Sequence, residues 1–310
     1  MLYIIKMTIN EENRSIYMTG FRIEKNTFNF PFLLILLIFR FSVDFILLHI
    51  VRIEFARFPT IVWKLDNAFE KAFKKKRFTL ITPDLLKLVV YGYKEARFLS
   101  FLIFEIYWRK IYEQYRINYK SPQVTIFDVG ANMGTFTLKA AKRIQNNGIV
   151  VAIEPFPYNF TRLQENIRLN RLKNIIVLAV ALGEMKGTVP LWLPPKNEEN
   201  TGIASTRFEV SDRFVQVPVL TLNDVMKELK IPSIDLLKLD TEGSELSILK
   251  GSAGSIRNIQ SMAIAAEHFP EQANELSKFL SSEEFNVQVK VLGGHPYVYA
   301  EIKHEHTVKI

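Results

Sequence analysis

The stretch VTIFDVGANMG at residues 124–134 decides the fold class of this chain. Its β-branched and aromatic residues predict a buried strand, and the glycines that follow predict a tight turn into a helix. In an open α/β sheet, ligands bind in the crevice at the carboxyl ends of the strands. The stretch therefore predicts a ligand site around Asp128, Gly130, Asn132 and Gly134.

Two familiar nucleotide-binding loops are excluded at this turn. A P-loop requires Lys followed by Ser or Thr after the last glycine, and Thr135-Phe136 stands there instead. The dinucleotide fingerprint requires a G-x-G pair, whereas Gly130 and Gly134 are four residues apart. A plain glycine-rich turn without a ligand remains the alternative for the glycines taken alone.

A second strand, IVVAI at residues 149–153, ends at another acid, Glu154, twenty residues after Gly134. An acid at this place in a nucleotide-binding α/β fold binds the ribose hydroxyls of the ligand. Small apolar residues follow the third strand at positions 180–183, and we expect Ala181 to lie over the adenine. The alternatives are a surface acid at Glu154 and an ordinary apolar turn at 180–183.

Short β-branched runs alternate with helical stretches from residue 124 onward. The runs are residues 124–129, 149–153, 175–179, 234–239 and 262–266. This alternation is typical of an α/β sheet that is mainly parallel. We expect residues 121–310 to form one catalytic domain of this class.

Two further features interrupt the alternation. An insertion at residues 187–219 contains apolar runs at 189–193 and 215–219, which predict a β-ribbon. Near the end of the chain, residues 285–291 and 297–302 lie on either side of two glycines and predict an antiparallel hairpin.

Three blocks of this sequence together resemble the FkbM-type methyltransferase family, a branch of the S-adenosylmethionine-dependent class I enzymes. They are FDVGANMG at residues 127–134, AIEP at 152–155 with Phe160 and a helix through Asn166, and IDLLKLDTEGSE at 234–245 continuing to LKG at 249–251. The first block indicates a class I methyltransferase, and the third, of the form K-x-D-x-E-G-x-E, narrows the resemblance to this family. The resemblance leaves residues 1–120 outside.

The resemblance implies a Rossmann-like class I methyltransferase fold, with a seven-stranded sheet and helices on both faces. It also implies S-adenosylmethionine as the cofactor and methyl transfer to oxygen, typically on a hydroxyl of a sugar, lipid or polyketide. The expected cofactor-binding residues are Asp128, Gly130, Asn132, Gly134, Glu154, Ala181 and Asp240.

The third block supplies the candidate catalytic residues. A hydroxyl is a poor nucleophile, so a base or an electrostatic partner must assist as its proton leaves. Strand alternation puts Lys238 and Asp240 on one face of the fourth strand. We hypothesise that Asp240, at the strand tip, binds the amino end of the cofactor or acts as the base, and that Lys238 fixes this carboxylate or carries charge near the acceptor oxygen. Glu242 is the next candidate base, and Glu245 caps the following helix in one interpretation.

Glu267-His268 follows the fifth strand. His268 is a candidate catalytic residue because a histidine takes up a proton near neutral pH. The alternative is a polar residue that only faces the crevice or the solvent. Nothing in the spacing of Asp240, Glu242 and His268 requires a metal ion, and we predict none.

Positive charge is concentrated in the N-terminal part of the chain. Residues 1–120 contain 20 Lys/Arg and 11 Asp/Glu, a net charge of +9, whereas residues 121–310 contain 20 and 21, a net charge of −1. We expect a weakly patterned segment at 1–27, an apolar helix at 28–58 and a basic helical extension at 59–120. Apolar residues at helical spacing make 84–119 the clearest helix of this extension.

The apolar run at residues 28–51 has the length of a membrane span but carries Arg40 and Asp44 near its middle. Its apolar residues favour insertion by about 5–10 kcal/mol and the two charges oppose it by about 5–7 kcal/mol, so three alternatives stay open: a transmembrane anchor, an interfacial helix and a buried helix. The basic residues that follow would keep the downstream domain in the cytoplasm. We therefore expect a cytoplasmic protein that is associated with the membrane through this run.

The leading hypothesis is an O-methyltransferase that acts on a glycan, lipid or related small molecule. An RNA methyltransferase is the alternative enzyme, although the chain has no recognisable RNA-binding module and nucleic acid is not an expected partner. A non-catalytic protein that binds the cofactor with the same fold is the third alternative. The absence of Cys excludes structural disulfides, a cysteine nucleophile and thiolate zinc sites.

Overall fold

The computed structural model describes residues 8–10, 15–18, 21–24, 71, 77–114, 123–195 and 203–303. The chain divides into two units, one comprising residues 1–85 and 89–97 and the other residues 86–88 and 98–310. The second unit contains the three sequence blocks and the strands that carry them.

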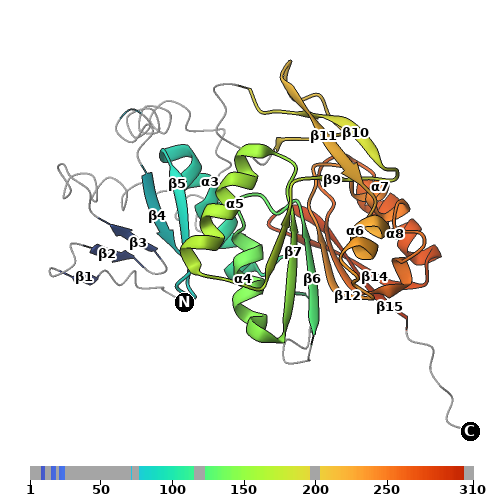
Figure 1. Ribbon diagram of the computed structural model, residues 1–310, viewed down its shortest axis with the longest axis horizontal. Coiled ribbons are helices and arrows are strands. Elements are labelled where there is room, and N and C mark those ends of the chain that lie inside the picture. Colours follow the sequence, from blue (N-terminus) through green and yellow to red (C-terminus); the bar gives the residue numbers. More distant parts are fainter. Residues whose placement is uncertain are drawn as a thin grey trace, which may run out of the picture. The chain divides into compact units, whose positions relative to one another are not determined.

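Seven strands form the central sheet, in the order β14-β15-β13-β12-β6-β7-β8 (Figure 1). They are β6 (Val124–Val129), β7 (Gly148–Ile153), β8 (Ile175–Leu178), β12 (Ile234–Leu239), β13 (Ile259–Ala265), β14 (Phe285–Leu292) and β15 (His295–Ile302). The strands from β8 to β13 pair in parallel, and β15 is antiparallel to both β13 and β14. In chain order the parallel strands have the 3-2-1-4-5 arrangement of doubly wound folds. The predicted α/β fold with a mainly parallel seven-stranded sheet is confirmed.

Each β-branched run predicted from the sequence forms a strand of this sheet. The β6 strand shows why, because all six of its residues are buried, as expected for a parallel strand covered on both faces. The predicted hairpin is also confirmed as β14 and β15, which are joined at Gly293 and Gly294 with φ angles of 65° and 92°. These positive φ values favour glycine at both positions of the turn.

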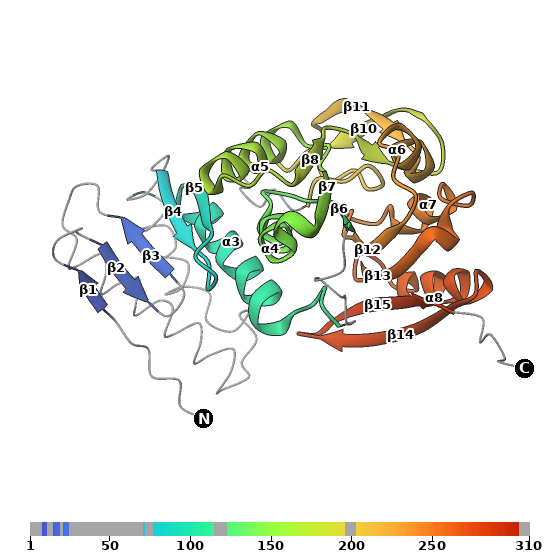
Figure 2. The same cartoon turned by 60° about the horizontal axis from the view of Figure 1, so that its bottom comes forward.

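Helices connect the strands and cover the sheet. The described helices include α3 (Tyr93–Phe104), the π-helix η2 (Glu105–Arg109), α4 (Thr135–Ile144), the 3₁₀-helix η3 (Gln145–Asn147), α5 (Pro157–Asn170), α6 (Leu222–Glu228), α7 (Glu245–Lys250), the 3₁₀-helix η5 (Ile256–Asn258) and α8 (Gln272–Ser282). Figure 2 shows α8 beside the β14–β15 hairpin, against which its apolar face packs.

Two hydrophobic cores cover the two faces of the sheet. On one face, Phe127 and Leu237 pack with apolar residues of α6, α7 and α8. On the other face, Ile126 and Leu236 pack with α4 and with the chain around η2. The predicted helices on both faces are confirmed. Because successive side chains of a strand alternate between faces, Ile126 of β6 and Leu236 of β12 share the side of α4.

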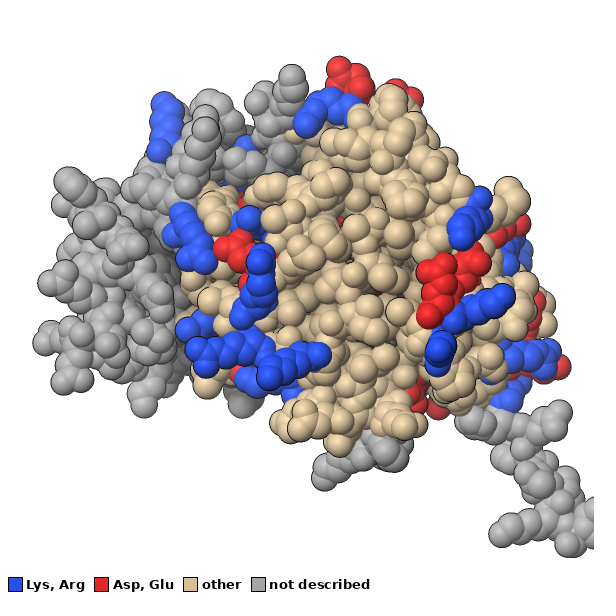
Figure 3. All heavy atoms as spheres, in the orientation of Figure 1, with Lys and Arg blue, Asp and Glu red and all other residues tan. Residues whose placement is uncertain are grey.

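Charged side chains on the surface lie mainly toward the two sides of the face in Figure 3, and the centre of that face has few. Four charged residues of the motifs, Asp128, Glu154, Lys238 and Glu245, are instead buried inside the domain. Burying charge without a partner is costly, so these groups must neutralise one another or be hydrogen bonded.

The insertion after β8 forms a small sheet of its own, in the order β10-β11-β9. The strands β10 (Gly187–Trp192) and β11 (Phe214–Leu220) are antiparallel, which confirms the predicted ribbon. The short strand β9 (Ala181–Leu182) pairs in parallel with β11 and was not predicted. Two residues are too few to produce a recognisable alternation.

The helical prediction for residues 84–119 is only partly correct. Helices occupy Tyr93–Arg109, but Lys87–Tyr91 forms the strand β5, which pairs with β4 (Arg77–Ile81). The three central residues of β5, at positions 88–90, are all buried. A short, fully buried strand and a buried helix have the same apolar pattern, so periodicity cannot separate them.

The segment 1–27 was expected to be weakly patterned, and it contains three short antiparallel strands. These are β1 (Thr8–Asn10), β2 (Ser15–Met18) and β3 (Phe21–Glu24). The apolar run at 28–51 lies outside the described residues, so its membrane association stays a prediction. Within the described parts of the chain, no helix combines the length and the apolar character needed to cross a bilayer.

We expect Leu237→Ala to lower the free energy of unfolding by about 2–5 kcal/mol, because it leaves a cavity between the central strands and the helices. Leu237 is fully buried in the central strand β12. Met185→Ala is the control, because Met185 is 78% exposed. Urea unfolding of both variants measures the difference, and equal midpoints would contradict this account of the core.

Candidate functional site

A cavity of about 250 Å³ lies at the carboxyl ends of the central strands. Its walls come from the loops after β6, β7, β8, β12 and β13 and from residues 98–106 of α3 and η2. The sheet order reverses at the neighbouring strands β6 and β12, and doubly wound folds bind ligands at this switch point. The cavity therefore lies where the first sequence block predicted a ligand site.

The loop after β6 depends on its two glycines. A Cβ atom on Gly130 would lie 1.8 Å from the carbonyl oxygen of Asp240, so only glycine allows these two strand ends to approach. A Cβ atom on Gly134 would lie 2.5 Å from Cδ1 of Leu163. Both glycines have positive φ angles, 77° and 94°, which other residues adopt with strain. Gly130 and Asn132 line the cavity, whereas Gly134 supports the loop from behind.

Glu154 lies at the cavity wall and holds the same loop. Its carboxylate accepts hydrogen bonds from the backbone N–H groups of Asn132 at 2.7 Å and Phe156 at 2.9 Å. Burial disfavours the charged carboxylate and raises the pKa of Glu154 to about 7. A carboxylate has about four acceptor positions, so two backbone donors leave capacity on both oxygens for a ligand hydroxyl.

Asp128 and Lys238 form a buried ion pair between β6 and β12. The two residues are paired in the sheet register, and the Lys238 ammonium lies 3.0 Å from the Asp128 carboxylate. The ammonium also donates to the carbonyl of Gly130 at 2.7 Å, and the Thr137 hydroxyl donates to Asp128. Burial opposes the charge on Lys238, but Asp128 and Asp240 outweigh it and raise its pKa.

The Asp128 carboxylate is thus paired with the ammonium of Lys238, a partner that the sequence did not predict for it. Asp128 is fully buried and does not belong to the cavity wall. A direct contact between Asp128 and a cofactor stays a prediction. Lys238 lines the cavity but is occupied by Asp128 and Gly130, so it positions the loop.

Asp240 is the partly exposed carboxylate at the tip of β12. The Tyr112 hydroxyl donates to its Oδ2 at 2.7 Å, and Lys238 Nζ lies 3.9 Å from the same oxygen. The side chain of Asp240 is 29% exposed, and both Asp240 and Tyr112 line the cavity. Tyr112 was not predicted, because it precedes Asp240 by 128 residues and belongs to no motif.

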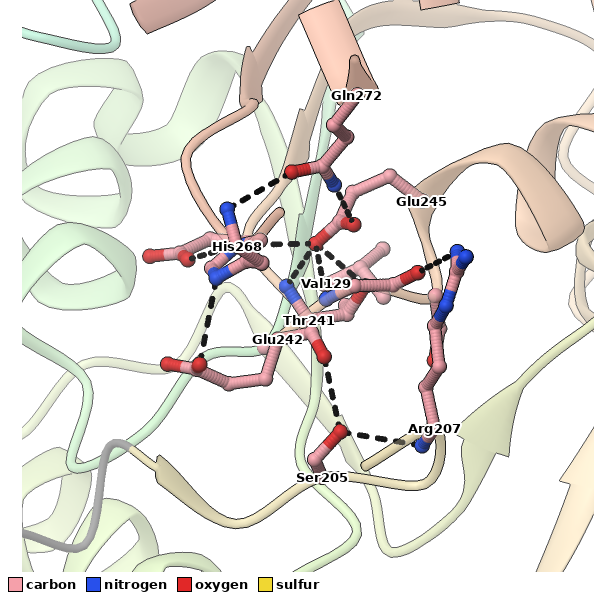
Figure 4. A network of polar contacts seen from close by, with 12 residues as sticks. Val129, Ser205, Arg207, Thr241, Glu242, Glu245, His268 and Gln272 are labelled. Carbon is pink, nitrogen blue, oxygen red and sulfur yellow. Dashed lines mark hydrogen bonds and ion pairs between the residues drawn. The ribbon is translucent and has the colours of Figure 1, made fainter. Parts of the chain in front are cut away.

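His268 is surrounded by carboxylates (Figure 4). Its Nδ1 lies 3.3 Å from Glu242, and its Nε2 lies 3.4 Å from Glu245 and 3.8 Å from Asp240. Burial alone would lower the pKa of His268, but the surrounding acids raise it to about 11. His268 is therefore protonated at neutral pH. The catalytic role of His268 stays a prediction, and the three acids around it favour its charged form.

Glu245 organises the loop between β12 and α7. Its Oε1 accepts from the backbone N–H of Thr241 at 2.6 Å and from the Thr241 hydroxyl at 2.9 Å. Its Oε2 accepts from the amide of Gln272 at 2.6 Å. Glu245 is fully buried and is the first residue of α7, where an acid suits the helix dipole. The capping interpretation is not confirmed, because α7 has no side-chain cap and the Glu245 carboxylate accepts from groups that precede the helix.

Glu242 lies on the cavity side of this loop. Burial raises its pKa, and the hydrogen bond with His268 opposes the rise. Two residues of the insertion donate hydrogen bonds to this loop (Figure 4). The Ser205 hydroxyl donates to the carbonyl of Glu242, and the Arg207 guanidinium donates to the carbonyl of Gly243, both at 2.8 Å. Ala181 also lines the cavity, as predicted, together with Val180 and Leu182.

The structure adds cavity residues that no motif indicated. They include Glu105, Thr135 and Tyr297, in addition to Tyr112. Glu267, of the pair noted after the fifth strand, also lines the cavity. Glu105 and Tyr112 precede the family-like blocks in sequence, so only the fold brings them to the site. Within the described ranges, no three His, Asp or Glu side chains are arranged to hold a metal ion.

The sheet order, the glycine-containing loop after β6 and the acid after β7 define a Rossmann-like class I methyltransferase fold. Residues 128–287, just over half of the 310-residue chain, match the model of the methyltransferase FkbM domain. The chain therefore belongs to the FkbM methyltransferase domain family.

Three curated relatives share this region. "Methyltransferase 1" of Beauveria bassiana is 30% identical over 145 residues, covering 41% of this chain and 57% of the relative. The hexuronic acid methyltransferase AglP of Haloferax volcanii is 24% identical, covering 54% of this chain and 65% of the relative. The 31-O-demethyl-FK506 methyltransferase FkbM of Streptomyces tacrolimicus is 27% identical, covering 49% and 68%.

We expect His268→Gln to lower the free energy of unfolding most near pH 6 and progressively less toward pH 11. The pKa of His268 in the folded protein, about 11, lies above its ordinary value of 6.5. Its contribution to stability is therefore complete below the ordinary value and is lost as the pH rises through 11.

Urea unfolding at a series of pH values measures this difference between wild type and variant. His295→Gln is the matched control, because His295 is 49% exposed. A His268→Gln effect that is constant from about pH 6 to pH 10 would show that the imidazole is not held as a cation.

Proposed function

We propose that this protein is an S-adenosylmethionine-dependent O-methyltransferase whose acceptor is a hydroxyl on a glycan, lipid or related small molecule. The family supports methyl transfer, and the names of two relatives refer to a hexuronic acid and to a 31-O position. This chain spans 57% of the length of the first relative, so the activity of the whole protein is part of the proposal. The observation that carries the proposal is the partly exposed Asp240 carboxylate in the cavity, next to the Gly130 loop.

The residues of the cavity fit S-adenosylmethionine. Glu154 has free acceptor capacity for ribose hydroxyls, and the small apolar wall at positions 180–182 suits an adenine ring. Thr135 is 3% exposed, and its hydroxyl lines the cavity without a hydrogen-bond partner among the described residues. A buried polar atom of this kind usually has a partner, and a bound polar ligand would provide one.

In the mechanism that we propose, S-adenosylmethionine supplies an electrophilic methyl group when bound, and the protein positions the acceptor hydroxyl. Asp240 accepts the hydrogen bond of that hydroxyl and takes its proton. Tyr112 donates to Oδ2 of Asp240 and so fixes the carboxylate plane. Lys238 and His268 lie 3.9 and 3.8 Å from this carboxylate on its inner side. Glu242, also in the cavity, is the second candidate base.

The charge of the cavity argues against an RNA acceptor. Besides Glu154, its wall contains the carboxylates of Glu105, Asp240, Glu242 and Glu267, while its only lysine among the described wall residues, Lys238, is paired with Asp128. Nucleic acid binding relies on cations that neutralise phosphates, and this wall does not supply them.

We expect Glu154→Gln to weaken S-adenosylmethionine binding by about tenfold or more. The amide keeps the shape of the side chain, but one carboxylate oxygen becomes an NH₂ group that cannot accept from a ribose hydroxyl. Calorimetric titration with S-adenosylmethionine and S-adenosylhomocysteine measures the change, with the exposed Glu184→Gln as control. Wild-type protein that is folded but binds neither compound would refute the proposed function.

We expect Asp240→Asn to reduce turnover by about 10²–10⁴-fold while the cofactor dissociation constant changes little. An asparagine preserves the contact with Tyr112 but cannot take the acceptor proton. Transfer of labelled methyl groups at saturating cofactor measures turnover, and calorimetry measures binding. Asp212→Asn, at an exposed position, is the control.

The two measurements separate the two hypotheses for Asp240. Normal turnover at saturation with much weaker cofactor binding would assign it to the amino end of the cofactor. Normal turnover and normal binding together would remove Asp240 from the mechanism.

A further inference from the structure

One wall of the cavity is built by a continuous helical segment that precedes the family match. Phe98, Phe101 and Leu102 of α3 and Ile106 of η2 line the cavity with their apolar side chains. The family match begins only at residue 128. Phe101 is 48% exposed although it is large and apolar, so the wall extends from the buried interior to the solvent.

Glu105 interrupts this apolar wall. It is the first residue of the π-helix η2, a rare helical form that is frequent at functional sites. The side chain is largely buried and pairs with Arg109 at 3.3 Å. Burial, and then the nearby carboxylates of Glu267 and Asp240, raise its pKa to about 7, while Arg109 opposes the rise.

Glu267 lies in the same part of the cavity and, like Glu105, pairs with a basic side chain. Its carboxylate contacts His295 of the hairpin, and its pKa is raised by burial and by the Asp240 carboxylate. Glu105 and Glu267 therefore lie close enough to Asp240 for their charges to interact. Glu105 pairs with Arg109 and Glu267 with His295, and each carboxylate retains acceptor positions on its oxygens.

Carboxylates predominate among the charged residues that line this end of the cavity, and their partners Arg109, His268 and His295 lie outside its wall. Asp240, Glu242, Glu105 and Glu267 contribute four carboxylates, whereas the Lys238 ammonium is already paired with Asp128. An anionic acceptor would be repelled at this distance. Hydroxyl groups, in contrast, would donate hydrogen bonds to the carboxylates, and such charge-assisted bonds are strong.

A second observation points to a ligand in this cavity independently of the acids. The Thr135 hydroxyl is 3% exposed, lines the cavity and has no hydrogen-bond partner among the described residues. Together with the aromatic wall, it marks the cavity as a binding site for a molecule with both polar and apolar parts.

We propose that the acceptor is an uncharged glycoside, in which hydroxyls of a neutral sugar bind Glu105 and Glu267 on either side of the methylated hydroxyl and an apolar aglycone lies along Phe98 and Phe101. This inference rests on the proposed function and narrows its acceptor. The acceptor oxygen gains the methyl group, its proton passes to Asp240, and S-adenosylhomocysteine is the co-product. We expect an anionic sugar such as a hexuronate not to be methylated.

The test uses full-length protein, S-adenosylmethionine with a labelled methyl group, and an extract of the cells in which the protein is native. Labelled products are separated by anion exchange and by reversed-phase chromatography. We expect the label in material that passes the anion exchanger and is retained on the apolar column. Extraction into organic solvent then distinguishes a lipid-linked glycoside from a free one.

Each outcome is decisive. Label in an anionic product, or in a product without apolar retention, overturns the inference and leaves the proposed function in place. An absence of label, with cofactor binding intact by calorimetry, contradicts the proposed function and removes the inference with it.

Variants connect the product to the residues. With the labelled neutral fraction as substrate, we expect Glu105→Gln and Glu267→Gln each to raise the acceptor KM by about tenfold, with an unchanged dissociation constant for S-adenosylmethionine as proof of folding. Phe101→Ser should raise the same KM. The exposed Glu275→Gln is the matched control and should leave it unchanged. Wild-type KM values in both glutamine variants would overturn the assignment.

Discussion

The ion pair between Asp128 and Lys238 connects the two strands on which the site depends. It joins the ends of β6 and β12 on the side of the sheet that faces the cavity, and both side chains are buried. Removing one partner of such a pair leaves an uncompensated charge in the interior, which strongly destabilises the fold. Because Lys238 also donates to the carbonyl of Gly130, the pair fixes the cofactor-side loop relative to the acid that follows β12.

The carboxylates after β12 are arranged around a permanent cation. His268 is held in its protonated form by Glu242, Glu245 and Asp240, and Glu245 in turn accepts from the backbone that leads into α7. Negative charges this close together would otherwise repel one another. The imidazolium allows several acids to share a small volume, so Asp240 and Glu242 can face the cavity without disrupting the loop that carries them.

The residues of the cavity wall come partly from the region of the family match and partly from the segment before it. The loops that carry Gly130 and Glu154 lie in the matched region, whereas Glu105, Tyr112 and the aromatic wall come from the segment before residue 128. In a doubly wound fold the sheet determines where the ligand binds, and the neighbouring segments determine the shape of the binding site. The segment before residue 128 therefore builds one wall of the cavity, and the matched region builds most of the rest.

The sequence by itself determined the parallel sheet, the hairpin, the ribbon and the loops after β6, β7 and β12, because each depends on neighbouring residues with a short repeat or a fixed spacing. It also determined that Lys238 and Asp240 share a face, since side chains alternate along a strand. Only the tertiary structure decided the charge of His268, the partner of Asp128 and the hydrogen bond from Tyr112 to Asp240. These depend on groups far apart in the chain and on their burial, and a pKa is set by the surroundings of a group rather than by its neighbours in sequence.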